Sequence, residues 1–172
     1  MLVAEQYDLK PKDAGDFMAG LVEGLLKKDD FKEFKLCIDG AASLENKVAT
    51  ALGEILKGDI GDIVNGFEDL YSAMGDFPMD FENCQQIQED MARIESWGQI
   101  FHDPKKLALT VATNMLMNFG KISADFVALQ SDVKAGKFEV SGEDVADIMV
   151  LTIGKVPEAS EVDMDTIKFT QW

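Results

Sequence analysis

Apolar side chains recur at intervals of three and four residues along most of this chain. Near the start, Phe17, Leu21 and Leu25 lie four residues apart, and Met18 and Val22 lie beside them. This spacing places all five side chains on one face of an α-helix. No stretch of the chain shows the alternation of strands and helices that builds βαβ units. The pattern therefore predicts an all-α fold.

Seven segments carry this helical pattern, and short turns separate them. Asp59 and the pair Asp103-Pro104 stand where a helix N-terminus is expected, and Ser141 is predicted to cap the last helix. Gly120 lies halfway along a long segment and indicates a kink there. We therefore expect a compact bundle of about seven helices. The segments are 13–27, 30–38, 43–57, 59–74, 81–101, 104–133 and 141–153.

Gly20 and Gly24 lie one helical turn apart on the first helix, next to its apolar face. Small residues at this spacing let two helix backbones approach closely. Because Glu23 lies beside them, we interpret the pair as a close helix–helix contact inside a globular protein and not as a membrane dimerisation motif.

The two ends of the chain lack the helical pattern and are expected to form extended arms. We divide the chain into an N-terminal arm over 1–12, one helical domain over 13–156 and a C-terminal arm over 157–172. Termini are usually polar and frayed, but these arms carry large apolar side chains that require burial. These are Leu2, Tyr7, Phe169 and Trp172. The alternatives are burial on their own domain and docking into a neighbouring copy.

The leading hypothesis is a non-enzymatic structural protein that self-associates or binds a protein partner through its arms.

The net charge of the chain indicates which classes of partner it can bind. It contains 16 basic and 32 acidic residues, which gives a net charge of −16, and Arg93 is its only arginine. Nucleic-acid binding requires clustered basic side chains, so we do not expect it. No stretch approaches the roughly 20 apolar residues of a membrane span. The acidic residues form no EF-hand loop, but weak calcium binding stays open, and a low-affinity calcium-responsive protein is a third hypothesis.

The sequence offers no recognisable catalytic site, cofactor-binding motif or metal-ligand set. It lacks the nucleophile elbow, the phosphate-binding loop and the zinc-binding helix motif, and His102 is its only histidine. A second hypothesis from another class rests on its nine methionines, because methionine lines adaptable apolar pockets. A carrier of a small apolar ligand or lipid would hold it between the long helix and the last one, against Met115, Phe119 and Met149.

The chain has two cysteines, Cys37 and Cys84. Each lies near a predicted helix end beside apolar residues, and the residues leave open whether they are two buried thiols or one disulfide. A bridge would stabilise the fold by roughly 4 kcal/mol on the chain-entropy model.

The first eight residues lack the apolar stretch of a signal peptide. We therefore expect either a cytosolic protein or one from which a leader has been removed.

Several of these features together resemble small helical proteins predicted in ciliates. The resemblance covers residues 14–154 and is carried by the glycine-rich first helix, Cys37 with Asp39, Cys84, and Trp97 with Phe101 before Asp103-Pro104. It implies no assigned activity, catalytic residue or ligand. It favours a processed protein of the secretory route, and with that compartment a Cys37–Cys84 disulfide.

Overall fold

The computed structural model describes residues 9–39, 44–77 and 82–162. Within these ranges it contains eight α-helices, three short 3₁₀ helices and no strand, which confirms the predicted all-α fold. The α-helices are α2 (Pro11–Leu26), α3 (Phe31–Ile38), α4 (Leu44–Leu56), α5 (Ile60–Gly75), α6 (Gln88–Trp97), α7 (Pro104–Met117), α8 (Phe119–Lys134) and α9 (Phe138–Ile153). The 3₁₀ helices are η1 (Glu82–Ile87), η2 (Gly98–His102) and η3 (Ala159–Glu161).

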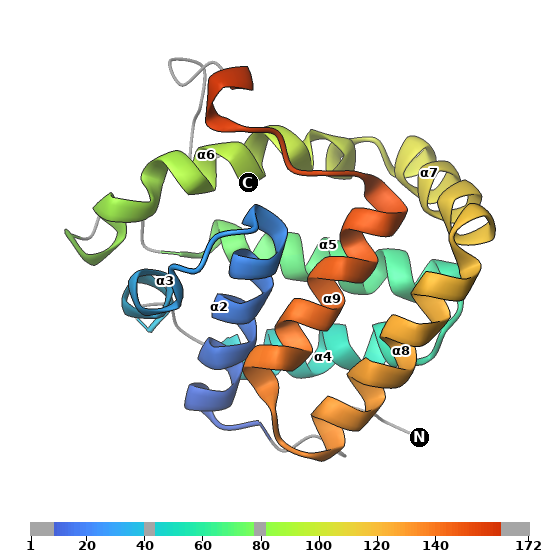
Figure 1. The fold of residues 1–172 in the computed structure, drawn as a ribbon, viewed down its shortest axis with the longest axis horizontal. Coiled ribbons are helices and arrows are strands. Elements are labelled where there is room, and N and C mark those ends of the chain that lie inside the picture. Colours follow the sequence, from blue (N-terminus) through green and yellow to red (C-terminus); the bar gives the residue numbers. More distant parts are fainter. Residues whose placement is uncertain (1–8, 40–43, 78–81, 163–172) are drawn as a thin grey trace.

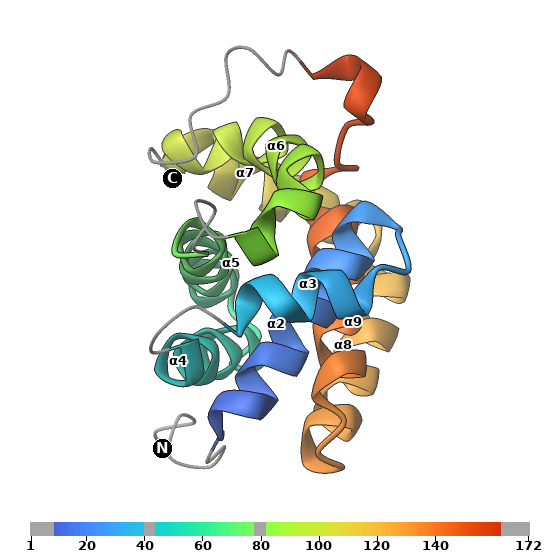
Figure 2. The same ribbon diagram turned by 90° about the vertical axis from the view of Figure 1, so that its left-hand side faces the viewer.

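Helices α2 and α9 lie side by side at the centre of the bundle (Figure 1). Figure 2 shows α4 and α5 as a layer on one side of this pair, with α8 on the other side. Helices α6 and α7 cover one end, and α3 packs against α2. The predicted apolar faces point inward, so Phe17, Phe34 and Phe67 are fully buried. Each such side chain contributes about 1.5–3 kcal/mol through its removal from water.

The central pair of helices packs through glycine. A Cβ atom at Gly20 of α2 would collide with the backbone of Glu139, and one at Gly142 of α9 would collide with the backbone of α2 at Phe17. Each helix therefore presents bare backbone to the other, as the spacing of Gly20 and Gly24 predicted. This close approach also brings Glu23 of α2 toward the acidic first turns of α9.

A disulfide joins Cys37 at the end of α3 to Cys84 in η1, with the two Cα atoms 4.6 Å apart. The sequence left open whether the cysteines are two buried thiols or one disulfide, and the structure contains the disulfide. Both cysteines are fully buried. The bridge spans 47 positions of the sequence, and these include all of α4 and α5. It therefore closes a covalent loop that contains α4 and α5, with its ends at α3 and η1.

The segment 104–133 forms two helices where the sequence predicted one. The predicted start is correct: Pro104 is the first residue of α7, and the Asp103 carboxylate accepts a hydrogen bond from the Lys106 N–H (3.2 Å). The helix ends at Met117, three residues before the expected kink at Gly120. At this break, the Asn118 side-chain amide donates to the carbonyl of Leu151 (3.3 Å) near the end of α9. The Asn118 amide thereby supplies a donor to one of the last carbonyls of α9, and α8 then runs alongside α9.

The last helix begins three residues earlier than the sequence predicted. Helix α9 starts at Phe138, so Ser141 lies inside it and does not cap it. The Ser141 hydroxyl instead donates to the carbonyl of Lys137 (2.8 Å). Phe138 packs partly buried against the core, and this packing extends the helix toward its N-terminus.

The segment that follows α9 is held by side chains of α6. Arg93 donates from Nε to the carbonyl of Pro157 (2.7 Å), and its guanidinium lies 3.6 Å from the Glu158 carboxylate. Trp97 donates from Nε1 to the carbonyl of Gly154 (2.8 Å). The single arginine of the chain therefore holds the segment after α9 against α6.

The predicted division into arms and body stays a prediction, because residues 1–8 and 163–172 lie outside the described part of the chain. Leu2, Tyr7, Phe169 and Trp172 fall in those two stretches. Of the helices described, none is long and apolar enough to cross a membrane.

We expect Gly20→Ala to lower the free energy of unfolding by about 1–3 kcal/mol, because its methyl group would push α2 away from the backbone of Glu139. Urea denaturation measures this loss. Gly120→Ala is the matched control: beyond the adjacent residues and backbone of its own helix, no described atom lies within 4 Å of the added methyl group, so it should stabilise α8 by up to about 1 kcal/mol. Equal effects of the two substitutions would contradict a glycine-dependent contact.

We expect the double variant Cys37→Ala, Cys84→Ala to lose about 4 kcal/mol of unfolding free energy, because a closed loop of this length restricts the unfolded chain. Urea denaturation of the wild type with and without reductant should show the same loss, and a thiol titration of the unfolded, unreduced protein should find no free thiol. A wild-type protein that is insensitive to reductant would show that the bridge does not stabilise the fold.

Candidate functional site

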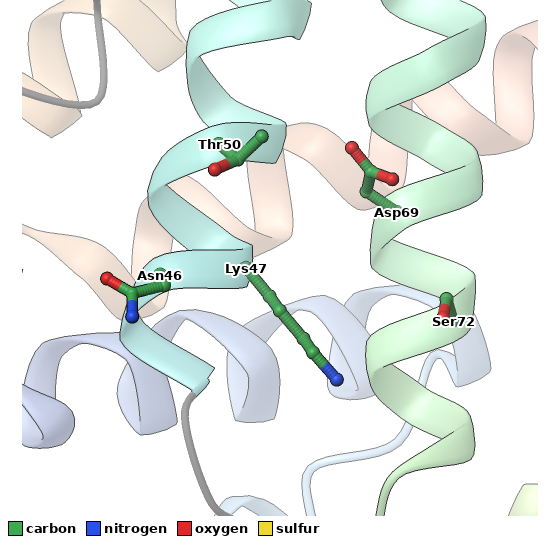
Figure 3. A pocket seen from close by; sticks show the side chains of 5 residues that line it. All are labelled: Asn46, Lys47, Thr50, Asp69 and Ser72. Atoms are coloured by element: carbon green, nitrogen blue, oxygen red, sulfur yellow. The ribbon is translucent and has the colours of Figure 1, made fainter.

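A polar groove lies between α4 and α5 and has a volume of about 250 Å³. Figure 3 shows the Lys47 side chain reaching from α4 toward α5, and the Asp69 carboxylate pointing back from α5 toward α4. The Lys47 ammonium forms an ion pair with Asp76 at the end of α5. The remaining lining residues are Asn46, Thr50 and Ser72.

A pair of carboxyl groups lies at the same helix contact. Burial, and then the neighbouring Asp69, raise the pKa of Glu54 from its ordinary 4.5 to about 7, while Lys57 opposes the shift and Asp62 adds to it. The Oε1 atom of Glu54 is buried and has no hydrogen-bond partner among the described residues. A similar pair joins α8 and α9, where burial and then Asp132 raise the pKa of Asp144 to about 8. Two helix contacts thus each hold a carboxyl group that binds its proton tightly.

These polar groups do not assemble the parts of a hydrolytic site within the described residues. The histidine at position 102 ends η2, where its ring meets the edge of Tyr71 at 6.5 Å between centroids. Cys37 and Cys84 are bonded to each other, so neither thiol is available as a nucleophile. The groove can hold a small polar molecule through its amide and hydroxyl groups, but it supplies no activated nucleophile.

A second, apolar groove runs along α8 and has a volume of about 320 Å³. Met115 of α7 lines one end, Gly58 of the turn between α4 and α5 lies at its margin, and the rest comes from α8. The α8 side chains that line it are Phe119, Ile122, Ser123, Phe126, Val127 and Gln130. A groove of this size lies at the lower end of the range for small-molecule sites.

Large apolar side chains on α7 and α8 are exposed to solvent. Leu116 is 82% exposed, Phe119 67% and Val127 66%, and Leu109 and Met117 are exposed as well. Single exposed apolar residues are common, but several on one helix pair indicate an interaction surface. We call the apolar groove together with these exposed side chains the α7–α8 apolar surface.

The structure separates the three residues that the carrier hypothesis grouped. Met115 and Phe119 line the apolar groove, whereas Met149 is fully buried in the core and is not among the groove residues. Sequence analysis did not single out Val127 or Phe126 as site residues. The available signal was that apolar residues of 104–133 occupy more of the helix circumference than one buried face requires.

The comparisons with known proteins identify one family. A family model described as SctB-like, "Secreted protein B-like", matches residues 3–153. No curated protein and no solved structure matches the chain. The resemblance to small helical ciliate proteins is therefore wrong: glycine spacing, two cysteines and an Asp-Pro helix start recur in many helical proteins, and the matching family is a different one.

We expect wild-type protein to lose stability as the pH rises from about 4.5 to about 7, and Glu54→Gln to reduce this loss. In that window the folded protein keeps a proton on Glu54 that the unfolded chain releases, so the free energy of unfolding falls with rising pH. Urea denaturation at about pH 5 and about pH 8 measures the difference. Glu89→Gln, at an exposed position of α6, controls for the loss of one charge. An equal pH dependence in wild type and Glu54→Gln would contradict the assignment to Glu54.

Proposed function

This chain belongs to the SctB-like, secreted protein B-like family, and from that premise we propose that it is a secreted, non-enzymatic protein that assembles with other copies of itself. The family description supports a secreted route. The observation that carries the proposal is the α7–α8 apolar surface, where Leu116, Phe119 and Val127 are each at least 66% exposed. Covering such side chains removes apolar area from water and favours association by roughly 25 cal/mol per Å² before the entropic cost of binding.

We further propose that the C-terminal segment of a neighbouring copy occupies the groove. That segment lies outside the described residues, so the argument uses its sequence. It carries Phe169 and Trp172 near its end, preceded by Asp163 and Asp165. Tryptophan and other aromatic side chains are common anchors of protein interfaces.

Charge also favours this pairing. The chain as a whole has twice as many acidic as basic residues, but residues 104–134 contain four lysines and only two aspartates. The α7–α8 apolar surface therefore lies on a locally basic part of an acidic protein. An acidic segment with aromatic residues is complementary to it in both charge and polarity. The N-terminal residues Leu2 and Tyr7 stay candidates for additional contacts.

The carrier hypothesis uses the same groove and is the second candidate. Its support is the apolar lining by Met115, Phe119 and Phe126 and the volume of about 320 Å³. A ligand held there would be a small apolar molecule or one acyl chain, bound at the surface and not between α7 and Met149 of α9.

We expect sedimentation velocity to show wild-type protein as a dimer or larger species, and both groove and segment variants as monomers. The groove variant is Phe119→Ser with Val127→Ser, and the segment variant is Phe169→Ala with Trp172→Ala. Each removes one side of the same contact, so each should weaken association by a factor of ten or more, as loss of central aromatic anchors does.

Leu36→Ser is the matched control, since Leu36 is also an exposed apolar side chain (57%) and lies on α3, away from α7 and α8. It should leave association unchanged. A monomeric wild type overturns the assembly proposal, and native mass spectrometry then separates the remaining cases. A bound apolar adduct that the groove variant lacks would favour the carrier, whereas a bare monomer would contradict both functions.

A further inference from the structure

Three glutamates meet where α2 packs against the start of α9. Glu23 comes from α2, and Glu139 and Glu143 lie one helical turn apart on α9. Each offers one carboxylate oxygen, and the three oxygens lie within 4.8 Å of one another. We call these three residues the glutamate cluster. It depends on the glycine contact described above, because Gly20 and Gly142 bring the two backbones together beside it.

Glu23 is an unusual member of this cluster because its side chain is buried. The residue is only 9% exposed, and its Oε2 atom has no hydrogen-bond partner among the described residues. A buried carboxylate oxygen without a donor costs free energy, on the order of 1–3 kcal/mol or more for a charged group. Such an oxygen normally has a proton, a cation or a metal ion beside it.

No basic side chain neutralises the cluster among the described ion pairs. Two lysines line the adjoining surface but form ion pairs elsewhere: Lys27 pairs with Asp147 at 3.4 Å, and Lys28 pairs with Asp90 at 2.9 Å. Asp29, in the segment between α2 and α3, adds a further carboxylate near Glu23. Burial, and then Glu143, Asp29 and Glu139, raise the pKa of Glu23 to about 8. Every neighbour named for Glu23 therefore adds negative charge.

We propose that the glutamate cluster is a divalent-cation site that takes calcium, with Glu23, Glu139 and Glu143 as its protein ligands. Calcium binds six to eight oxygens at 2.3–2.6 Å, so two of its ligands lie at most about 5.2 Å apart. The oxygens of the cluster fit within that limit. Magnesium demands near-octahedral geometry at 2.0–2.1 Å and usually keeps several of its waters, so a site of three protein carboxylates suits calcium better. Water and Asp29 would complete the coordination of the larger ion.

Calcium bound at this position would bridge α2 and α9, so the site would act on the stability of the whole bundle. We expect calcium at about ten times its Kd to raise the Tm of wild-type protein by about 3–6 °C. The same concentration of magnesium should raise it less. Sodium chloride of equal ionic strength controls for general screening of the net charge of −16.

Two variants locate the effect. Glu23→Gln keeps the shape of the side chain but cannot release a proton and become a carboxylate ligand, so it should fold and lose the calcium shift. Glu54→Gln removes a buried carboxyl group of raised pKa from the α4–α5 contact. The described residues form no group of three carboxylates with metal-ligand spacing at that contact. This variant should keep the full calcium shift. Calorimetric titration with calcium chloride should find one site in wild type and Glu54→Gln and none in Glu23→Gln.

The proposal is overturned if calcium raises the Tm no more than sodium chloride does. It is also overturned if the calcium shift persists in Glu23→Gln, or if both variants lose it, because the effect would then come from the acidic surface as a whole. The test is independent of self-association, since the glutamate cluster and the α7–α8 apolar surface share no residue.

Discussion

The close contact between α2 and α9 is the constraint on which the rest of the structure depends. Gly20 and Gly142 each place bare backbone against the other helix, and the resulting pair forms the centre around which α4, α5 and α8 pack (Figures 1 and 2). Dispersion and burial stabilise such a contact only when the backbones fit closely. The positions of Glu23, Glu139 and Glu143 follow from the same contact, so the core geometry also determines the charge arrangement at its edge.

The acidic character of the chain extends into its helix contacts. Carboxyl groups with raised pKa values lie between α2 and α9, between α4 and α5, and between α8 and α9. In each case burial is the first cause and a second carboxyl group the next. In a protein of net charge −16, carboxylates at the helix contacts repel one another, and a bound proton or cation reduces this repulsion.

The fold class, the Asp103-Pro104 helix start and the close approach at Gly20 were predictable from the sequence, because each depends on local spacing or local backbone chemistry. The break at Asn118 was not, since it depends on the carbonyl of Leu151, which lies far along the chain. The early start of α9 depends likewise on the packing of Phe138. The two sites were not predictable for the same reason. The exposure of Phe119 and Val127 depends on which helices pack together, and so does the contact of Glu23 with Glu143. The periodicity of apolar residues does not show which helices are neighbours.

The central helix pair also sets when folding can be completed. Lys27 of α2 and Asp147 of α9 touch across 120 positions of the sequence, so α2 cannot bury its glycine face until α9 has been synthesised. Contacts between such distant segments form late and slow the folding of a chain. A nascent chain that contains only α2 to α8 lacks the helix that covers the glycine face of α2.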